Sequence, residues 1–148
     1  MMNKQYWMAA ALGLVLLPGL SQAADDVNFL PFDAAVQEAI NSGVIDGSVK
    51  FYLGDKKPTG KVSVLKSGLT TSQKSNAFGK SVEASCNRAL HSSLIRFQKS
   101  AKAAGANAVV NLVSNYNNNV YKDNEKYECH KGSIMSGVAL KGDLAKVQ

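Results

Sequence analysis

Two cysteines and two histidines are the residues whose types could hold a metal ion: Cys86, His91, Cys129 and His130. Thiolate and imidazole groups are ligands that zinc and copper prefer. His91 follows Cys86 by five residues, which is about 140° around a helix. Cys129 and His130 are neighbours, so on one strand they point to opposite faces. The spacing therefore disfavours a shared site, and metal binding by these residues is kept as the alternative interpretation.

A second stretch, residues 54–61, ends in Gly-Lys like a phosphate-binding loop. Five residues separate its glycines where that loop has four, and Val62 stands where a hydroxyl must reach magnesium. The residues that follow are β-branched, whereas the loop must open a helix whose N-terminal amides hold the phosphate. The scattered carboxylates form no acid/base pair of defined spacing. We therefore expect no cofactor and no enzymatic activity.

Five lysines lie close together in the sequence around two predicted strands: Lys50, Lys56, Lys57, Lys61 and Lys66. Phe51 and Tyr52 are interleaved with them, and such a mixture can bind polyanions or single-stranded nucleic acid. Because we expect the chain to be exported from the cytoplasm, we expect no nucleic-acid partner. The cluster therefore predicts either a patch for lipopolysaccharide or another anionic envelope component, or a plainly solvated surface.

The first 23 residues have the layout of a secretory signal peptide. Lys4 precedes an apolar run over residues 8–17, and the small-residue sequence Ser21-Gln22-Ala23 predicts cleavage after Ala23. The run is shorter than the roughly 20 residues that span a bilayer. Lys4 is the sole charged residue that cleavage removes, and its loss changes the formal charge from +6 to +5. We expect a periplasmic or secreted chain with no transmembrane segment after cleavage.

An even number of cysteines in an oxidising compartment favours a disulfide. Cys86 and Cys129 are the only two in the chain, so one intramolecular connectivity exists. Closing a loop of this length stabilises the fold by roughly 4 kcal/mol in the loop-entropy model. The chain has no C-x-x-C motif, which disfavours redox chemistry at a thiol. The sequence thus predicts a Cys86–Cys129 disulfide.

A long helix followed by a strand organises the chain over residues 86–113. Its apolar positions recur with helical spacing on one stripe: Leu90, Leu94, Phe97, Ala101 and Ala104. Ser85 or Asn87 is the expected N-cap, and Gly105 ends the helix. A shorter amphipathic helix is expected over residues 32–40, because apolar residues recur there every four positions.

The remaining apolar runs predict strands, and residues 72–85 read as a surface loop. The first two strands are expected to form a hairpin, and the polar residues 115–124 the tip of another. The expected strands cover residues 47–54, 61–71, 108–113, 125–131, 133–140 and 144–147. This order predicts the α+β class, with a mostly antiparallel sheet packed against one long helix plus a short N-terminal helix.

The stretch AKAAGANAVVNLV, residues 101–113, resembles the helix-to-strand step of the small α+β domain shared by the RcsF-like and YbjQ-like families. The later YECHKGS, residues 127–133, is similar to the end of an RcsF-like domain. The resemblance covers residues 85–140. It implies a core over residues 61–148, with residues 24–60 as an accessory helix and strand of the same exported domain. It also implies an envelope-sensing role, and it is compatible with oligomers.

These observations together predict a non-enzymatic periplasmic or secreted binding module. Its expected partner is another protein or an anionic envelope component, linked through the resemblance to envelope stress. The alternative is an exported metal-handling protein that uses the cysteines and histidines as ligands.

Overall fold

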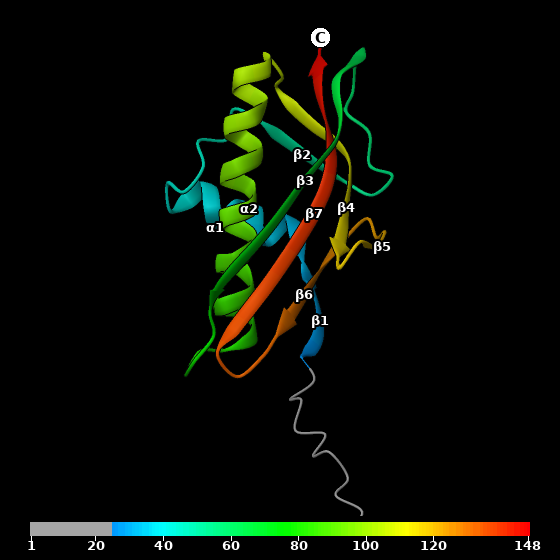
Figure 1. The fold of residues 1–148 in the computed structure, drawn as a ribbon. Helices are drawn as coiled ribbons and strands as arrows, with labels where there is room; N and C mark the ends of the chain where they lie inside the picture. The colour runs from blue at the N-terminus through cyan, green and yellow to red at the C-terminus, as the bar shows by residue number, and fades with distance from the viewer. Residues whose placement is uncertain (1–24) are drawn as a thin grey trace, which may run out of the picture.

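A curled, mixed β-sheet and two helices make up residues 25–148, the part of the chain that the computed structural model describes (Figure 1). The α+β class predicted from the sequence is confirmed. The predicted signal peptide, residues 1–23, lies outside the described residues. In chain order the elements are β1 (Asp26–Pro31), α1 (Phe32–Asn41), β2 (Lys50–Leu53), β3 (Val62–Asn76), α2 (Val82–Ala104), β4 (Ala108–Tyr116), β5 (Asn119–Tyr121), β6 (Lys126–Lys131) and β7 (Met135–Val147).

Strand β7 is the centre of the sheet, and the sheet forks along its length. On one side β7 pairs with β3 from end to end. On the other side its first residues pair with β6 and its later residues with β4. Beyond these, β1 pairs with β6, whereas β2 and β5 pair with β4. Among the described residues every pairing is antiparallel except β2 with β4.

Helix α2 begins earlier than the sequence indicates. Its N-cap is Ser81, whose hydroxyl accepts a hydrogen bond from the Ala84 amide at 3.1 Å. The predicted caps, Ser85 and Asn87, are wrong, since both are buried inside the helix. The predicted end is correct, because Gly105 takes the left-handed conformation with φ of 76° and closes the helix.

The predicted hairpin between the first two strands is wrong. Strand β2 pairs in parallel with β4, while β3 pairs with β7, so β4 and β7 lie between them. The connection crosses from one edge of the sheet to the other. The Gly54 amide at its start donates to the Leu112 carbonyl, and Lys61 at its end exchanges hydrogen bonds with Gln148. Alternation identifies a strand and its buried face, but it does not identify the partner strand.

The other differences between the expected and the observed strands arise because some strands are polar. Residues 72–76, expected in a loop, continue β3, and residues 26–31 form β1. In β3 the side chains of Ser72, Lys74 and Asn76 face solvent while those of Gln73 and Ser75 face α2. A strand with one open face contains few apolar residues, and so its sequence resembles a loop. The two strands expected over residues 133–140 and 144–147 form one strand, β7, which continues through Lys141.

The main core lies between α2 and one face of the sheet. Its largest fully buried side chains include Leu90, Leu94, Phe97, Leu112, Tyr127, Leu140 and Leu144. A smaller cluster of Ala108, Val110 and Ala145 packs with Tyr52 and Val147. Neither helix within residues 25–148 combines the length and the apolar character needed to cross a bilayer.

Candidate binding site

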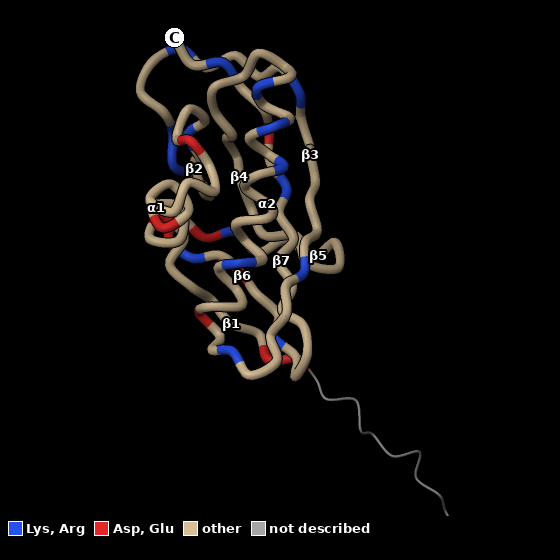
Figure 2. The backbone as a smooth tube through the Cα atoms, turned by 90° about the vertical axis from the view of Figure 1, so that its left-hand side faces the viewer, with Lys and Arg blue, Asp and Glu red and all other residues tan. Residues whose placement is uncertain are grey.

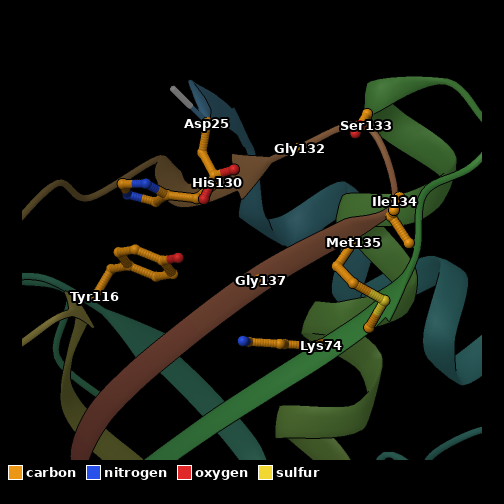
Figure 3. A pocket seen from close by; sticks show the side chains of 9 residues that line it. All are labelled: Asp25, Lys74, Tyr116, His130, Gly132, Ser133, Ile134, Met135 and Gly137. Atoms are coloured by element: carbon orange, nitrogen blue, oxygen red, sulfur yellow. The ribbon is translucent and has the colours of Figure 1, made fainter. Parts of the chain in front are cut away.

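A hollow of about 280 Å³ opens on the sheet face that points away from α2 (Figure 3). Ser75 of β3 points toward α2, where its hydroxyl donates to the Ser85 carbonyl at 2.5 Å. The preceding residue, Lys74, therefore points to the opposite face and lines the hollow. The other side chains that line it are Asp25, Tyr116, His130, Ser133, Ile134 and Met135. Four strands thus contribute to one site.

Two stacked rings form the floor of the hollow. The ring centroids of Tyr116 and His130 lie 3.5 Å apart with an interplanar angle of 8°. His130 Nε2 lies 2.6 Å from Glu128 Oε1, and both side chains are largely buried. This contact fixes the imidazole, and the stack in turn fixes the phenol ring.

Gly137 makes room for this stack. A Cβ atom at this position would lie 3.2 Å from Tyr116 Cε2. We expect Gly137→Ala to displace the Tyr116 ring from His130 and to cost about 1 kcal/mol of stability through overpacking. The NMR signals of the His130 ring protons report the change, because they lose the ring-current effect of the phenol. Tyr116→Leu provides the reference for complete loss, and ring-proton shifts unchanged from the native protein in Gly137→Ala would contradict the prediction.

The hollow has mixed electrostatic character. Burial raises the pKa of the Tyr116 phenol above its usual range, and the negative charge of Asp25 raises this pKa further. The phenol is therefore a neutral hydrogen-bonding group at physiological pH. Lys74 supplies a cation on another wall, and Ile134 supplies exposed apolar surface. The arrangement can bind a ligand that has both polar and apolar parts.

The same residues do not form a nucleophilic triad. Ser133 and His130 both line the hollow, and a carboxylate contacts the imidazole. A serine nucleophile must be within hydrogen-bond reach of its base. Over residues 25–148 no hydrogen bond joins Ser133 Oγ to His130, and Figure 3 places Ser133 beyond Gly132, away from the ring. The geometry suits binding better than acyl transfer.

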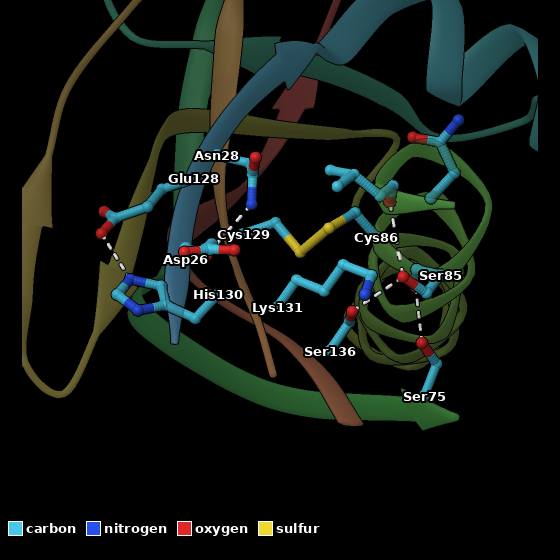
Figure 4. The surroundings of a disulfide bond; sticks show 12 residues. Asp26, Asn28, Ser75, Ser85, Cys86, Glu128, Cys129, His130, Lys131 and Ser136 are labelled. Atoms are coloured by element: carbon cyan, nitrogen blue, oxygen red, sulfur yellow. Dashed lines mark hydrogen bonds and ion pairs between the residues drawn. A yellow bond between two sulfur atoms is a disulfide. The ribbon is translucent and has the colours of Figure 1, made fainter. Parts of the chain in front are cut away.

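The two cysteines lie behind this site, on the core side of β6 (Figure 4). Their sulfur atoms are 2.09 Å apart and form the predicted disulfide, with both residues fully buried. Next to the disulfide, Ser85 Oγ and Ser136 Oγ form a hydrogen bond of 2.8 Å. Because Cys129 and His130 are adjacent on β6, the disulfide ties the strand that holds His130 to α2.

The structure does not bring together the four candidate metal ligands. Cys86 and Cys129 are bonded to each other, and His130 contacts Glu128. His91 Nε2 lies 3.0 Å from the Ala35 carbonyl oxygen, which identifies it as a donor to the backbone of α1. No group of three or more His, Cys, Asp or Glu side chains within the described part of the chain is arranged to hold a metal ion.

The five candidate lysines divide between two edges of the sheet. Lys50, Lys56 and Lys57 lie on or just after β2, whereas Lys61 and Lys66 lie at the start of β3. Lys56 Nζ lies 3.0 Å from Asp33 and 3.5 Å from Glu125, and the hydrogen bond to Asp33 raises the pKa of the lysine. Lys57 Nζ donates to Asn111 Oδ1 at 3.2 Å. These lysines do not form the single patch that the hairpin would have produced.

The sequence did not identify most residues of the hollow. Tyr116 lies in a stretch that we expected to be a hairpin tip, and Lys74 in one that we expected to be a loop. A local signal exists only for His130, because its neighbour Cys129 had to point into the core. The others depend on strand pairings between distant segments. Comparisons with family models, with curated proteins and with solved structures give no match for this chain.

Proposed function

We propose that this chain is an exported, non-enzymatic binding module that contacts a phosphate-bearing amphiphile of the cell envelope. Lipopolysaccharide and anionic phospholipids share this chemistry. The observation that carries the proposal is a group of exposed apolar side chains next to lysines at the rim of the hollow. The resemblance to RcsF-like domains supports a role in sensing the state of the envelope.

Three large apolar side chains are exposed at one end of the sheet, and we call them the apolar tip. Phe78 is 75% exposed, Ile134 64% and Met135 43%. Phe78 follows β3, and Ile134 precedes Met135, the first residue of β7. The two segments adjoin, since the Ala77 amide donates to the Ile134 carbonyl at 2.7 Å and Asn76 pairs with Met135. Contiguous exposed apolar side chains on a small domain commonly mark a binding surface.

Three lysines lie near the apolar tip, either along the chain or in the hollow. Lys80 follows Phe78 by two residues, Lys131 ends β6, and Lys74 lines the hollow beside Met135. An apolar surface bordered by lysines can insert among acyl chains while its ammonium groups contact phosphate. Each lysine near an anionic membrane contributes about 1 kcal/mol. Asp25 and the Tyr116 phenol offer hydrogen bonds to headgroup hydroxyl or amine groups.

Vesicle co-sedimentation of the chain without residues 1–23 tests the proposal. We expect binding to phosphatidylcholine vesicles that contain phosphatidylglycerol or lipopolysaccharide to exceed binding to phosphatidylcholine alone by at least about tenfold. Raising the ionic strength should weaken the binding, because it screens the contacts between lysine and phosphate. A preference for lipopolysaccharide over phosphatidylglycerol would identify the source of the phosphate.

Single substitutions locate the contact. Phe78→Ser, Ile134→Ser and Lys74→Gln should each weaken vesicle binding, because each removes an apolar or cationic contact at the apolar tip. Val120→Ser is the matched control, since Val120 is 61% exposed but lies on β5. Equal binding to charged and uncharged vesicles, or an equal loss in Val120→Ser, would refute the proposal.

A further inference from the structure

Strand β3 is a 15-residue strand with a free edge. Within residues 25–148 it pairs with β7 on one side and with no strand on the other. Figure 2 shows β3 at the border of the molecule, next to α2. A free edge of this kind is a template for a further strand, which natural proteins usually shorten, kink or cover.

The pairing pattern shows which backbone groups of β3 are free. The Ala77 amide donates to the Ile134 carbonyl, and pairing with β7 is regular from Leu69 to Asn76. Hydrogen-bonded and non-hydrogen-bonded pairs alternate along an antiparallel ladder. Counting back from Ala77, the N–H and C=O groups of Thr70, Ser72 and Lys74 point to the free edge. Irregular pairing between Val64 and Leu69 leaves residues 69–76 as the usable length.

A basic hollow runs alongside this edge. It has a volume of about 340 Å³ and lies between β3 and α2, with Arg96, Lys99 and Ser100 on the helix side. On the strand side it is lined by Leu69, Thr70 and Thr71, and the buried Thr71 Oγ1 has no hydrogen-bond partner. A strand added to β3 would therefore place alternate side chains beside Arg96 and Lys99.

The segments that form this edge carry charge of almost one sign. From the start of β3 to the end of α2, residues 62–104 contain seven Lys and Arg residues and one acidic residue, Glu83. Glu83 lines a different hollow, together with Glu38 of α1 and Asn87, and so does not neutralise the β3 edge. The nearest acidic side chain on β7, Asp143, already accepts hydrogen bonds from the Gly68 amide and from Asn111 Nδ2.

We propose that the β3 edge, together with Arg96 and Lys99, binds an extended acidic segment of a partner polypeptide by strand addition. The free N–H and C=O groups call for another polypeptide backbone, which neither a lipid nor a glycan supplies. The basic flank calls for Asp or Glu side chains. A second copy of this chain would bring its own lysine-bearing β3 against these cations, and so charge repulsion opposes edge-to-edge dimers.

Three synthetic peptides of equal length separate backbone pairing from charge. The first alternates Glu and Val, the second alternates Lys and Val, and the third alternates N-methyl-Glu and Pro. The third, the Glu-Pro peptide, keeps the acidic charge but cannot donate backbone hydrogen bonds, because its Glu nitrogens are methylated and its Pro nitrogens lie in rings. In NMR titrations we expect saturable binding of the Glu-Val peptide alone, with slowed amide hydrogen exchange at Thr70, Ser72 and Lys74.

Substitutions in the chain itself test the same contacts. Arg96→Ser with Lys99→Ser should weaken binding of the Glu-Val peptide by about tenfold. Lys57→Ser with Lys122→Ser removes equal charge away from β3 and α2, and it should leave the affinity close to that of the native chain. Ser72→Pro should block the edge, since it deletes an outward N–H group, whereas Ser72→Ala should not.

Four results would overturn the proposal. They are equal binding of the Glu-Pro peptide, equal binding of the Lys-Val peptide, no binding of the Glu-Val peptide, and a dimer of this chain paired through β3. Equal binding of Glu-Pro would show that charge alone acts. The comparison of peptides does not depend on the variants, and so it decides the matter even where Ser72→Pro fails to fold.

Discussion

Replacing both cysteines by alanine is expected to lower the free energy of unfolding by about 4 kcal/mol. Cys86 and Cys129 are separated by 43 residues, and the disulfide between them restricts the unfolded chain over that whole length. A loss of this size is a large part of the 5–15 kcal/mol that is typical of a folded domain. Both side chains are fully buried, so the loss of their sulfur atoms adds a packing cost.

Urea denaturation of the Cys86→Ala/Cys129→Ala variant and of the oxidised native chain measures this difference. Reductant is the control. It should lower the unfolding midpoint of the native chain toward that of the variant and should leave the variant unchanged. Equal midpoints for the oxidised chain and the variant would show that the disulfide adds nothing to stability.

The disulfide also connects the two proposed binding surfaces. Cys129 lies beside His130 on β6, and His130 with Tyr116 forms the floor of the hollow. Cys86 lies on α2, the helix that supplies Arg96 and Lys99 to the β3 edge. Breaking the disulfide therefore changes the position of His130, in the hollow, relative to α2, which carries Arg96 and Lys99.

The sequence predicts the buried face and the end of α2 well because these signals are local. Leu90, Leu94 and Phe97 recur with the helical period, and all three are fully buried against the sheet. Gly105 marks the helix end through its own backbone conformation, with φ of 76°. The disulfide was also predictable, because with two cysteines the number of connectivities is one.

The pairing of strands could not be predicted in the same way. Nothing local in residues 50–53 indicates that β2 pairs in parallel with β4, and nothing in β7 indicates that it pairs with β6 and β4 in succession. The hollow depends on those pairings, since Lys74, Tyr116 and His130 come from three different strands. The predicted lysine patch relied on a hairpin that does not form, so its lysines come from strands that do not pair with each other.

Tyr127 makes the stability of the fold sensitive to pH in the alkaline range. Its side chain is fully buried, and its hydroxyl donates to Asn87 Oδ1 at 2.5 Å. Asn87 Nδ2 in turn donates to Glu38 Oε2 at 2.9 Å. Burial raises the pKa of the phenol far above its ordinary value, and the negative charges of Glu38 and Glu83 raise it further.

The direction of the pH effect follows from this raised pKa. In the unfolded chain the phenol ionises near pH 10, while in the folded chain it keeps its proton to higher pH. Its contribution to stability is therefore complete below about pH 10 and is lost progressively as the pH rises toward the folded pKa. In that window this one group lowers the free energy of unfolding by about 1.4 kcal/mol per pH unit.

Tyr127→Phe separates this effect from the titration of other groups. Near neutral pH we expect the variant to be less stable than the native chain by about 1–2 kcal/mol, because Asn87 Oδ1 is left in the core without its donor. Above pH 10 the native chain should lose stability faster than the variant, so that the two curves of unfolding free energy converge. Urea denaturation at a series of alkaline pH values measures both curves. Curves that stay parallel up to pH 11 would show that Tyr127 keeps an ordinary pKa in the folded chain, and that the hydrogen bond to Asn87 does not hold its proton.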